Sequence, residues 1–167
     1  MTRYQLAKLV AMAGKLESRK RLQKMIYLLK AAGCPIDAEY GLHLYGPYSQ
    51  DVACLVDDMV SAGILKEKVC GKRFDYVVRE SIRPALKRYE RNKTGQAEAK
   101  VLERFADRIN AWAKEDLWQL ELASTVLFFH KQGFEWPQAL DAACEFKNVL
   151  TDDEATKKAL KLAKSVA

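Results

Sequence analysis

The residues best suited to contact a partner are basic side chains gathered near the start of the chain. Lys15, Arg19, Lys20, Arg21 and Lys24 lie close together, with one acid, Glu17, among them. Lysines and arginines in such a group can bind the phosphates of a nucleic acid. Basic residues at the start of a helix oppose the helix dipole, which favours a binding role, although a solvated helix start is the other interpretation.

A second basic group lies in a predicted β-hairpin. Residues 64–70 and 73–79 are two β-prone segments, and Gly71-Lys72 between them is a signal for a tight turn. Basic side chains in such a hairpin can reach a phosphate backbone or a minor groove. Lys66, Lys68, Lys72 and Arg73 make the hairpin basic, and the last three are the candidate contacts.

A winged helix-turn-helix has this order of elements, with helices followed by a hairpin. In such a fold the helix before the hairpin normally enters the major groove of DNA. Here that helix, predicted over residues 49–62, carries three aspartates and no Lys or Arg. DNA phosphates would repel it. Only its first turn, with Tyr48, Ser49 and Gln50, is suited to bases or phosphates, and Ser49 and Gln50 are the candidate contacts. Nucleic-acid contacts are therefore expected mainly at the two basic groups.

The acidic helix also supports an alternative, in which this half of the chain binds a protein. The candidate partner-binding residues are Tyr27, Tyr45, Tyr48, Asp57 and Asp58. The segment 45–48, Tyr-Gly-Pro-Tyr, would then form a binding pocket. A tight turn without any binding role is the other interpretation of the same residues.

No pattern in the chain is typical of an enzyme. His43 and His130 are the only histidines, and each is expected to be structural. Glu121 is an acid inside an apolar segment, where a carboxylate could have a perturbed pKa or could simply be paired. The four cysteines show no metal-ligand spacing and are expected to be free thiols. We expect a non-enzymatic protein without cofactor or metal.

The basic cluster must be positioned by a helix that begins near residue 19. Apolar residues recur there at the spacing of one helix face, and polar ones recur out of phase on the face expected to meet solvent. The inward set is Leu22, Met25, Ile26 and Leu29, and the outward set is Lys20, Gln23, Lys24 and Tyr27. A short strand is predicted over residues 39–45, a turn at Gly46-Pro47, and a helix N-cap at Ser49.

The second half of the chain is predicted to be helical, after a basic connector over residues 80–93. Residues 116–131 are apolar almost all round, which is typical of a helix at the centre of a bundle or of one that packs on a second copy of the protein. Thr151 is predicted to cap a helix over residues 152–165. The fold class is mainly α (α+β), with a winged helix-turn-helix-like domain over residues 1–93 and a helical bundle over residues 94–167.

Charge is distributed unevenly between these halves. Residues 1–93 hold 18 Lys/Arg and 10 Asp/Glu, a net charge of +8, and residues 94–167 hold 10 and 12, a net charge of −2. A basic half suggests an anionic partner, such as DNA bound by a regulatory protein, although mild basicity without a specific partner is also common. No signal peptide or membrane span is predicted, so the protein is expected to be cytoplasmic, with no membrane partner.

Two segments carry a resemblance to a known family. They are Leu22-Gln23-Lys24 with Tyr27-Leu28, and the segment 45–49, Tyr-Gly-Pro-Tyr-Ser. With their surroundings over about the first eighty residues, they resemble the YwgA-like family of uncharacterised prokaryotic proteins. More distantly, the two motifs are similar to SocA-like, or Panacea, antitoxin domains. The resemblance implies a winged-helix-like first half, and the antitoxin likeness favours a protein partner.

Overall fold

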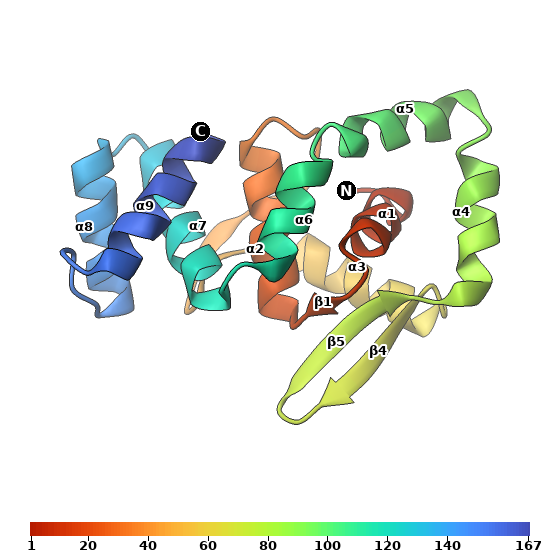
Figure 1. Cartoon of the computed structure of the whole chain (residues 1–167), viewed down its shortest axis with the longest axis horizontal. Helices are drawn as coiled ribbons and strands as arrows, with labels where there is room; N and C mark the ends of the chain where they lie inside the picture. Colours follow the sequence, from red (N-terminus) through yellow and green to blue (C-terminus); the bar gives the residue numbers. More distant parts are fainter.

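The computed structural model describes residues 1–167, which form a mainly α-helical chain with two small antiparallel sheets (Figure 1). The helices are α1 (Arg3–Ala13), α2 (Arg19–Ala31), α3 (Gln50–Ser61), α4 (Arg83–Tyr89), α5 (Lys93–Glu103), α6 (Ala106–Lys114), α7 (Leu117–Lys131), α8 (Trp136–Lys147) and α9 (Glu154–Val166), with a 3₁₀ turn η1 (Glu80–Ile82). The strands are β1 (Leu16–Glu17), β2 (Gly41–His43), β3 (Gly46–Tyr48), β4 (Leu65–Cys70) and β5 (Arg73–Val78). The predicted mainly α (α+β) class is confirmed.

Helix α2 lies at the centre of the N-terminal part. Every residue from Arg21 to Leu29 is buried, because α2 packs against α3, α6, α7, β1 and β3. The predicted inward stripe is confirmed. The prediction that Gln23, Lys24 and Tyr27 face solvent is wrong, since a helix covered on several sides has almost no free face. Lys20, at the start of the helix, is half-buried.

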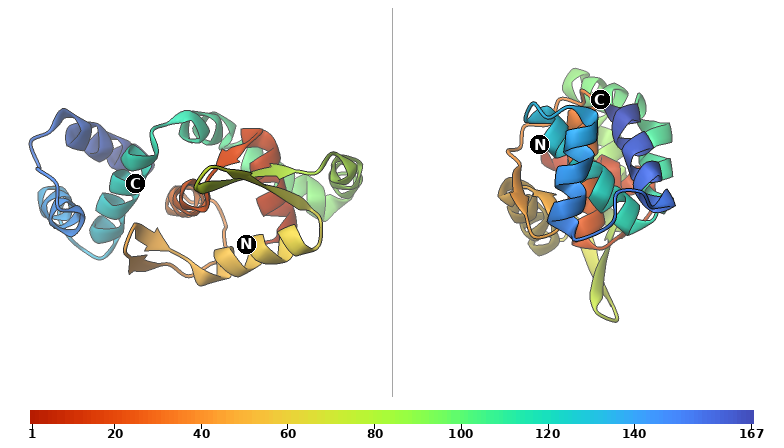
Figure 2. Two further views of the ribbon diagram at one scale, coloured as in Figure 1. Left: turned by 90° about the horizontal axis from the view of Figure 1, so that it is seen from below. Right: turned by 90° about the vertical axis from the view of Figure 1, so that its left-hand side faces the viewer.

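The larger sheet has the strand order β1-β5-β4, and all of its strand pairs are antiparallel. Strands β4 and β5 form the predicted hairpin, with Cys70 opposite Arg73 across the turn at Gly71-Lys72. Tyr76 of β5 is buried at the base, where β5 pairs with β1 and packs on α1. The other end of the hairpin extends beyond the helices (Figure 2), so its side chains lie outside the core.

The smaller sheet corrects the prediction for the segment after α2. Strands β2 and β3 pair with Leu42 opposite Pro47, so the turn falls at Leu44-Tyr45 and not at Gly46-Pro47. Gly46 has a φ of +91°, and a Cβ atom there would collide with Thr125 Oγ1 of α7. The glycine is therefore needed for close packing of β3 on α7 as well as for its backbone conformation.

Helix α7 is the centre of the C-terminal part and contacts α8, α9, α2 and β3. The sequence predicts that residues 116–131 form either the centre of a bundle or a surface for a second copy. In the structure, α7 is the centre of a bundle formed by helices of the same chain. Helix α9 begins later than predicted, because Asp153 and not Thr151 caps it, with Asp153 Oδ1 accepting a hydrogen bond from the Ala155 N–H.

One hydrophobic core contains residues from both sides of the predicted boundary at residue 93. Helices α5 and α6 follow that boundary and pack back on α1 (Figure 1). The division into residues 1–93 and 94–167 stays a prediction. No helix combines the length and the apolar character needed to cross a lipid bilayer.

Candidate functional site

Arg19, the first residue of α2, is held by groups from three other elements. Its guanidinium pairs with Asp57 of α3, lies 3.5 Å from Glu67 Oε2 of β4, and donates a hydrogen bond of 2.8 Å from Nε to Tyr76 Oη of β5. The hydrogen bond to Asp57 raises the pKa of Arg19 above its ordinary value. A phosphate would have to compete with these partners, so Arg19 is better explained as a link between α2, α3 and the hairpin.

Lys15 and Arg73 share two acids where β1 pairs with β5. Lys15 Nζ lies 2.8 Å from Glu17 Oε1 and 3.6 Å from Asp75 Oδ2. Arg73 lies 3.3 Å from Glu17 Oε1 and 3.0 Å from Asp75 Oδ1. The hydrogen bond from Lys15 lowers the pKa of Glu17. Two cations and two carboxylates leave this network with no net charge.

Lys20 and Lys24 turn toward α7 and the β2–β3 hairpin. Lys20 Nζ lies 3.3 Å from the centre of the Tyr45 ring and 3.8 Å from Glu121 Oε1. Lys24 is only 2% exposed and donates a hydrogen bond of 2.7 Å from Nζ to Pro47 O. Burial lowers the pKa of Lys24 to about 7, against the opposing effect of the Glu121 charge. Lys24 is thus an interior lysine that cannot contact an extended phosphate backbone.

The first turn of α3 is fixed from inside the fold. Ser49 Oγ accepts a hydrogen bond from the Val52 N–H at 3.3 Å, which confirms the predicted N-cap. Ser49 itself is buried, and its backbone is hydrogen-bonded to the side chain of Gln23. Of the two residues predicted to contact bases from this turn, only Gln50 is exposed.

The five residues of the protein-binding alternative are not gathered on one surface. Tyr27 is buried, with its ring 5.1 Å from that of Tyr40 and 6.2 Å from that of Phe128. The two aspartates of α3 are paired, Asp57 with Arg19 and Asp58 with Arg3. Tyr45 is exposed and Tyr48 is half-buried, and both lie on the β2–β3 hairpin.

A cavity of about 360 Å³ opens between α2, α3 and the β2–β3 hairpin. No acidic residue is among the residues that line it. The lining residues are Arg19, Lys20, Leu22, Gln23, Lys24, His43, Tyr45, Gly46, Tyr48, Gln50, Ala53 and Val56. Tyr45 and Tyr48 line this cavity together with Lys20 and Lys24.

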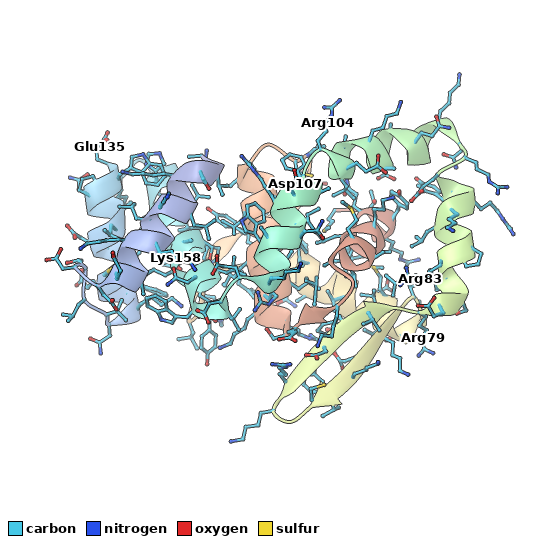
Figure 3. All side chains as sticks on the ribbon, in the orientation of Figure 1. Arg79, Arg83, Arg104, Asp107, Glu135 and Lys158 are labelled. Atoms are coloured by element: carbon cyan, nitrogen blue, oxygen red, sulfur yellow. The ribbon has the colours of Figure 1, made fainter.

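Cations without an acidic partner are concentrated in β4, β5, α4 and the segments next to them. Residues 64–93 hold ten Lys/Arg and four Asp/Glu, and the resulting net charge of +6 equals that of the whole chain. A groove where the hairpin meets α4 is lined by Lys66, Lys68, Arg79 and Arg83, of which Arg83 pairs with Glu80 at 2.9 Å. Figure 3 shows Arg79 and Arg83 at this junction. Lys68 and Lys72, two of the predicted contacts, are exposed here without an ion pair.

A comparison with curated proteins finds a relative of this chain. The chain is similar to a protein from Bacillus subtilis (strain 168) that carries the name Uncharacterized protein YwgA, with 31% identity over 134 residues. The similar region covers 74% of this chain and 72% of that relative. The chain belongs to the YwgA-like family. No protein-family model matches it.

In this YwgA-like protein the two motifs that carry the family resemblance meet each other in space. Gln23 and Lys24 of the first motif donate hydrogen bonds to the backbone oxygens of Ser49 and Pro47 in the second. The motifs are thus the two sides of one junction, which also forms part of the cavity wall. Their chemistry is explained first by the packing of β3 and α3 on α2.

The basic residues that follow the hairpin are the part of the site that sequence reasoning missed. The sequence presents residues 80–93 as a basic connector. In the structure they form η1, the exposed helix α4 beside the hairpin, and the first residue of α5. With Arg79, the cations here are Arg79, Arg83, Lys87, Arg88, Arg91 and Lys93, against Glu80 and Glu90. A charge count in a 30-residue window, rather than over half of the chain, finds this segment.

Proposed function

We propose that this protein is a non-enzymatic nucleic-acid-binding protein of the winged-helix type, with a regulatory role on DNA. The contact surface is the β4–β5 hairpin together with α4. The observation that carries the proposal is the concentration of the whole net charge of the chain in residues 64–93, where most cations have no acidic partner. Unpaired Lys and Arg side chains on one surface are the electrostatic footprint of a nucleic-acid interface.

The order of the elements supports the winged-helix part of the proposal. Helices α1, α2 and α3 are followed by the β4–β5 hairpin, and the short strand β1 between α1 and α2 pairs with β5. In this assignment the hairpin is the wing. Its exposed end extends beyond the helices, so that it can reach a duplex without a clash from the rest of the chain (Figure 2).

The proposed interface avoids the body of α3. That helix presents Asp57 and Asp58, both already paired with arginines, and it has no cation that could approach a phosphate. The duplex would instead lie along the wing and α4, on the side of Lys66, Lys68 and Arg79. Such contacts read the backbone more than the bases, so weak sequence preference is expected.

The test is a titration of the protein into a labelled mixed-sequence DNA duplex, followed by fluorescence anisotropy between about 50 and 200 mM salt. The test variant is Lys68→Gln/Arg79→Gln/Lys87→Gln. We expect it to bind at least about tenfold more weakly, with a salt slope lower by about 0.9 for each phosphate that is no longer neutralised. The control is Lys131→Gln/Lys157→Gln/Lys161→Gln, which removes the same charge from exposed positions on α7 and α9.

Equal losses in the test and control variants would mean that only the total charge matters, and would refute the proposed interface. Absence of binding by the unmodified protein at low salt would refute nucleic-acid binding altogether. Variants at Arg19 and Lys24 are expected to affect DNA binding little, because both side chains are engaged within the fold.

One observation favours a second function, that of a protein-interaction module of the antitoxin or adaptor type. The turn of the β2–β3 hairpin exposes large apolar side chains, with Leu44 at 77% and Tyr45 at 50% exposure. Exposed apolar residues at a turn are suited to a partner groove. A Leu44→Ser/Tyr45→Ser variant that loses a partner in a pull-down, while binding DNA normally, would assign this role to the hairpin.

A further inference from the structure

Lys24 is a buried lysine without a buried carboxylate in contact with it. No carboxylate oxygen lies within 4.0 Å of its Nζ atom, and Glu121, the only acid on α7, pairs with Lys147 at 3.0 Å and Lys20 at 3.8 Å. Buried lysines are rare unless they are paired. An ammonium group can donate three hydrogen bonds, and Lys24 donates one, to Pro47 O. Two donors are left for a group that is not part of the chain.

The cavity next to Lys24 has the composition of a site for an organic anion. Three of its lining residues are cations and none is an acid. Arg19 is already neutralised by Asp57, and Lys20 lies on the ring of Tyr45 at the rim, so Lys24 is the cation with free hydrogen-bond donors. A volume of about 360 Å³ is within the range of small-molecule sites.

The remaining lining favours a flat apolar body over a bare inorganic ion. Leu22 of α2 and Ala53 and Val56 of α3 supply aliphatic surface. The aromatic rings come from the β2–β3 hairpin, where those of His43 and Tyr48 lie 5.4 Å apart. One ammonium group and mostly apolar walls fit one carboxylate on an aromatic ring.

Gln23 does not add a second strong site for an anion. Both ends of its side-chain amide are held by the backbone of Ser49, with the nitrogen donating to Ser49 O and the oxygen accepting from the Ser49 N–H. Lys24 therefore remains the principal donor of the cavity, and a ligand with one carboxylate matches it better than one with two.

We propose that the cavity between α2, α3 and the β2–β3 hairpin binds a small aromatic carboxylate, with the carboxylate on Lys24 and the ring between the apolar and aromatic walls. The site does not depend on the nucleic-acid function, because it lies on other elements than the wing surface and α4. Since α3 supplies part of the wall, the ligand would contact both helices that flank the hairpin β2–β3.

The experiment uses isothermal titration calorimetry with 2-naphthoate as the probe and 2-naphthamide as its uncharged counterpart. We expect the full-length protein to bind 2-naphthoate at least tenfold more tightly than the amide, since a hydrogen-bonded charge in a buried site contributes about a 10- to 100-fold change in affinity. Lys24→Met should lose the preference for the acid. Lys30→Met, which removes an exposed lysine from the same helix, should keep it.

A second variant tests the proposal even if the Lys24→Met protein does not fold. Ala53→Leu leaves Lys24 in place and fills the cavity from α3, so it should weaken both probes together. Equal affinity of unmodified protein for acid and amide, or unchanged binding by a folded Lys24→Met variant, would overturn the proposal. Binding of inorganic phosphate that matches 2-naphthoate would also overturn it, because the walls would then contribute nothing.

Discussion

The side-chain amide of Gln23 pairs with both polar groups of the Ser49 backbone. Gln23 Nε2 donates to Ser49 O at 2.9 Å, and Gln23 Oε1 accepts from the Ser49 N–H at 3.0 Å. Both residues are buried, so neither backbone group has water as a substitute partner. The pair joins the middle of α2 to the first turn of α3 and thereby fixes where α3 begins.

Gln23→Leu should therefore lower the free energy of unfolding by about 1–3 kcal/mol, because it leaves the buried Ser49 N–H without a partner, whereas Ser49 O still accepts from the Ala53 N–H. Urea denaturation followed by circular dichroism measures the change. Gln96→Leu makes the same replacement at an exposed position of α5 and should cost less than about 0.5 kcal/mol. A loss in Gln23→Leu no larger than in this control would mean that the Gln23 amide contributes little to stability.

Two of the glycines with positive φ, Gly46 in β3 and Gly71 in the β4–β5 turn, should respond differently to alanine. At Gly46, with φ of +91°, a Cβ atom would meet Thr125 Oγ1 in a buried contact. At Gly71, with φ of +62°, it would meet nothing within 4 Å. Gly71→Ala should cost about 1 kcal/mol for backbone strain alone, and Gly46→Ala about 1–3 kcal/mol more because the new methyl group displaces Thr125.

Thermal unfolding of the two alanine variants separates the cost of backbone strain from the cost of the contact between the new methyl group and Thr125. The double variant Gly46→Ala/Thr125→Ala should recover part of the loss, because it removes the side chain that the new methyl group meets. If Gly46→Ala and Gly71→Ala lose the same stability, then β3 is not packed on α7 as closely as the structure has it.

Sequence periodicity predicts which residues of α2 face the core but not how many of its faces are covered. The stripe of Leu22, Met25, Ile26 and Leu29 is buried as predicted. The opposite face carries polar residues, which is typical of a solvent face, yet Gln23 and Lys24 are buried by β3 and α3. A polar residue whose hydrogen bonds are satisfied by backbone groups looks, in a sequence, like an exposed one.

The candidate site could be predicted only in part for a related reason. The hairpin and its Lys68 and Lys72 could be predicted because a tight turn and its flanking strands are local in sequence. The pairing of Arg19 with Asp57 and Glu67 joins residues distant in the chain, so no local pattern predicts it. The cavity, too, forms only when β3 is placed on α2.

Lys24 should make stability depend on pH. Burial lowers its pKa in the folded protein to about 7 from the ordinary value of 10.5. Above about pH 7 the unfolded chain therefore binds more protons at this residue than the folded one, so unfolding becomes less favourable as pH rises, by up to about 1.4 kcal/mol per pH unit. Below pH 7 both states are protonated and the cost of burying the charge is constant.

Lys24→Met should remove both the free-energy cost of burying the Lys24 charge and the dependence of stability on pH that comes from this residue. At pH 7 and below, the variant should be more stable by about 1–4 kcal/mol, and the advantage should shrink as pH rises to about 9. Chemical denaturation at several pH values measures the difference in the free energy of unfolding between the two proteins. The contributions of groups that titrate in both proteins cancel in this difference. The charged groups around Lys24 are Glu121 and Lys147 from α7 and α8 and Lys20 from α2. A difference independent of pH would show that Lys24 stays protonated in the fold.

Glu121 is the buried acid that balances the lysines between α2, α7 and α8. Its Oε2 accepts a hydrogen bond of 3.0 Å from Lys147 Nζ, and its Oε1 lies 3.8 Å from Lys20 Nζ. The side chains of Glu121 and Lys147 are about 11% and 10% exposed. Glu121→Gln should cost about 3–5 kcal/mol, because it leaves Lys147 buried without a counter-charge.

Glu121→Leu/Lys147→Met should lose much less than Glu121→Gln, since no uncompensated charge is left at the interface of α7 and α8. Lys158→Met, which removes the exposed pair with Glu115, is the matched control and should cost less than about 1 kcal/mol. Urea denaturation of the four proteins gives the comparison. A double variant as unstable as Glu121→Gln would mean that the lost stability comes from packing of the side chains and not from the unpaired lysine.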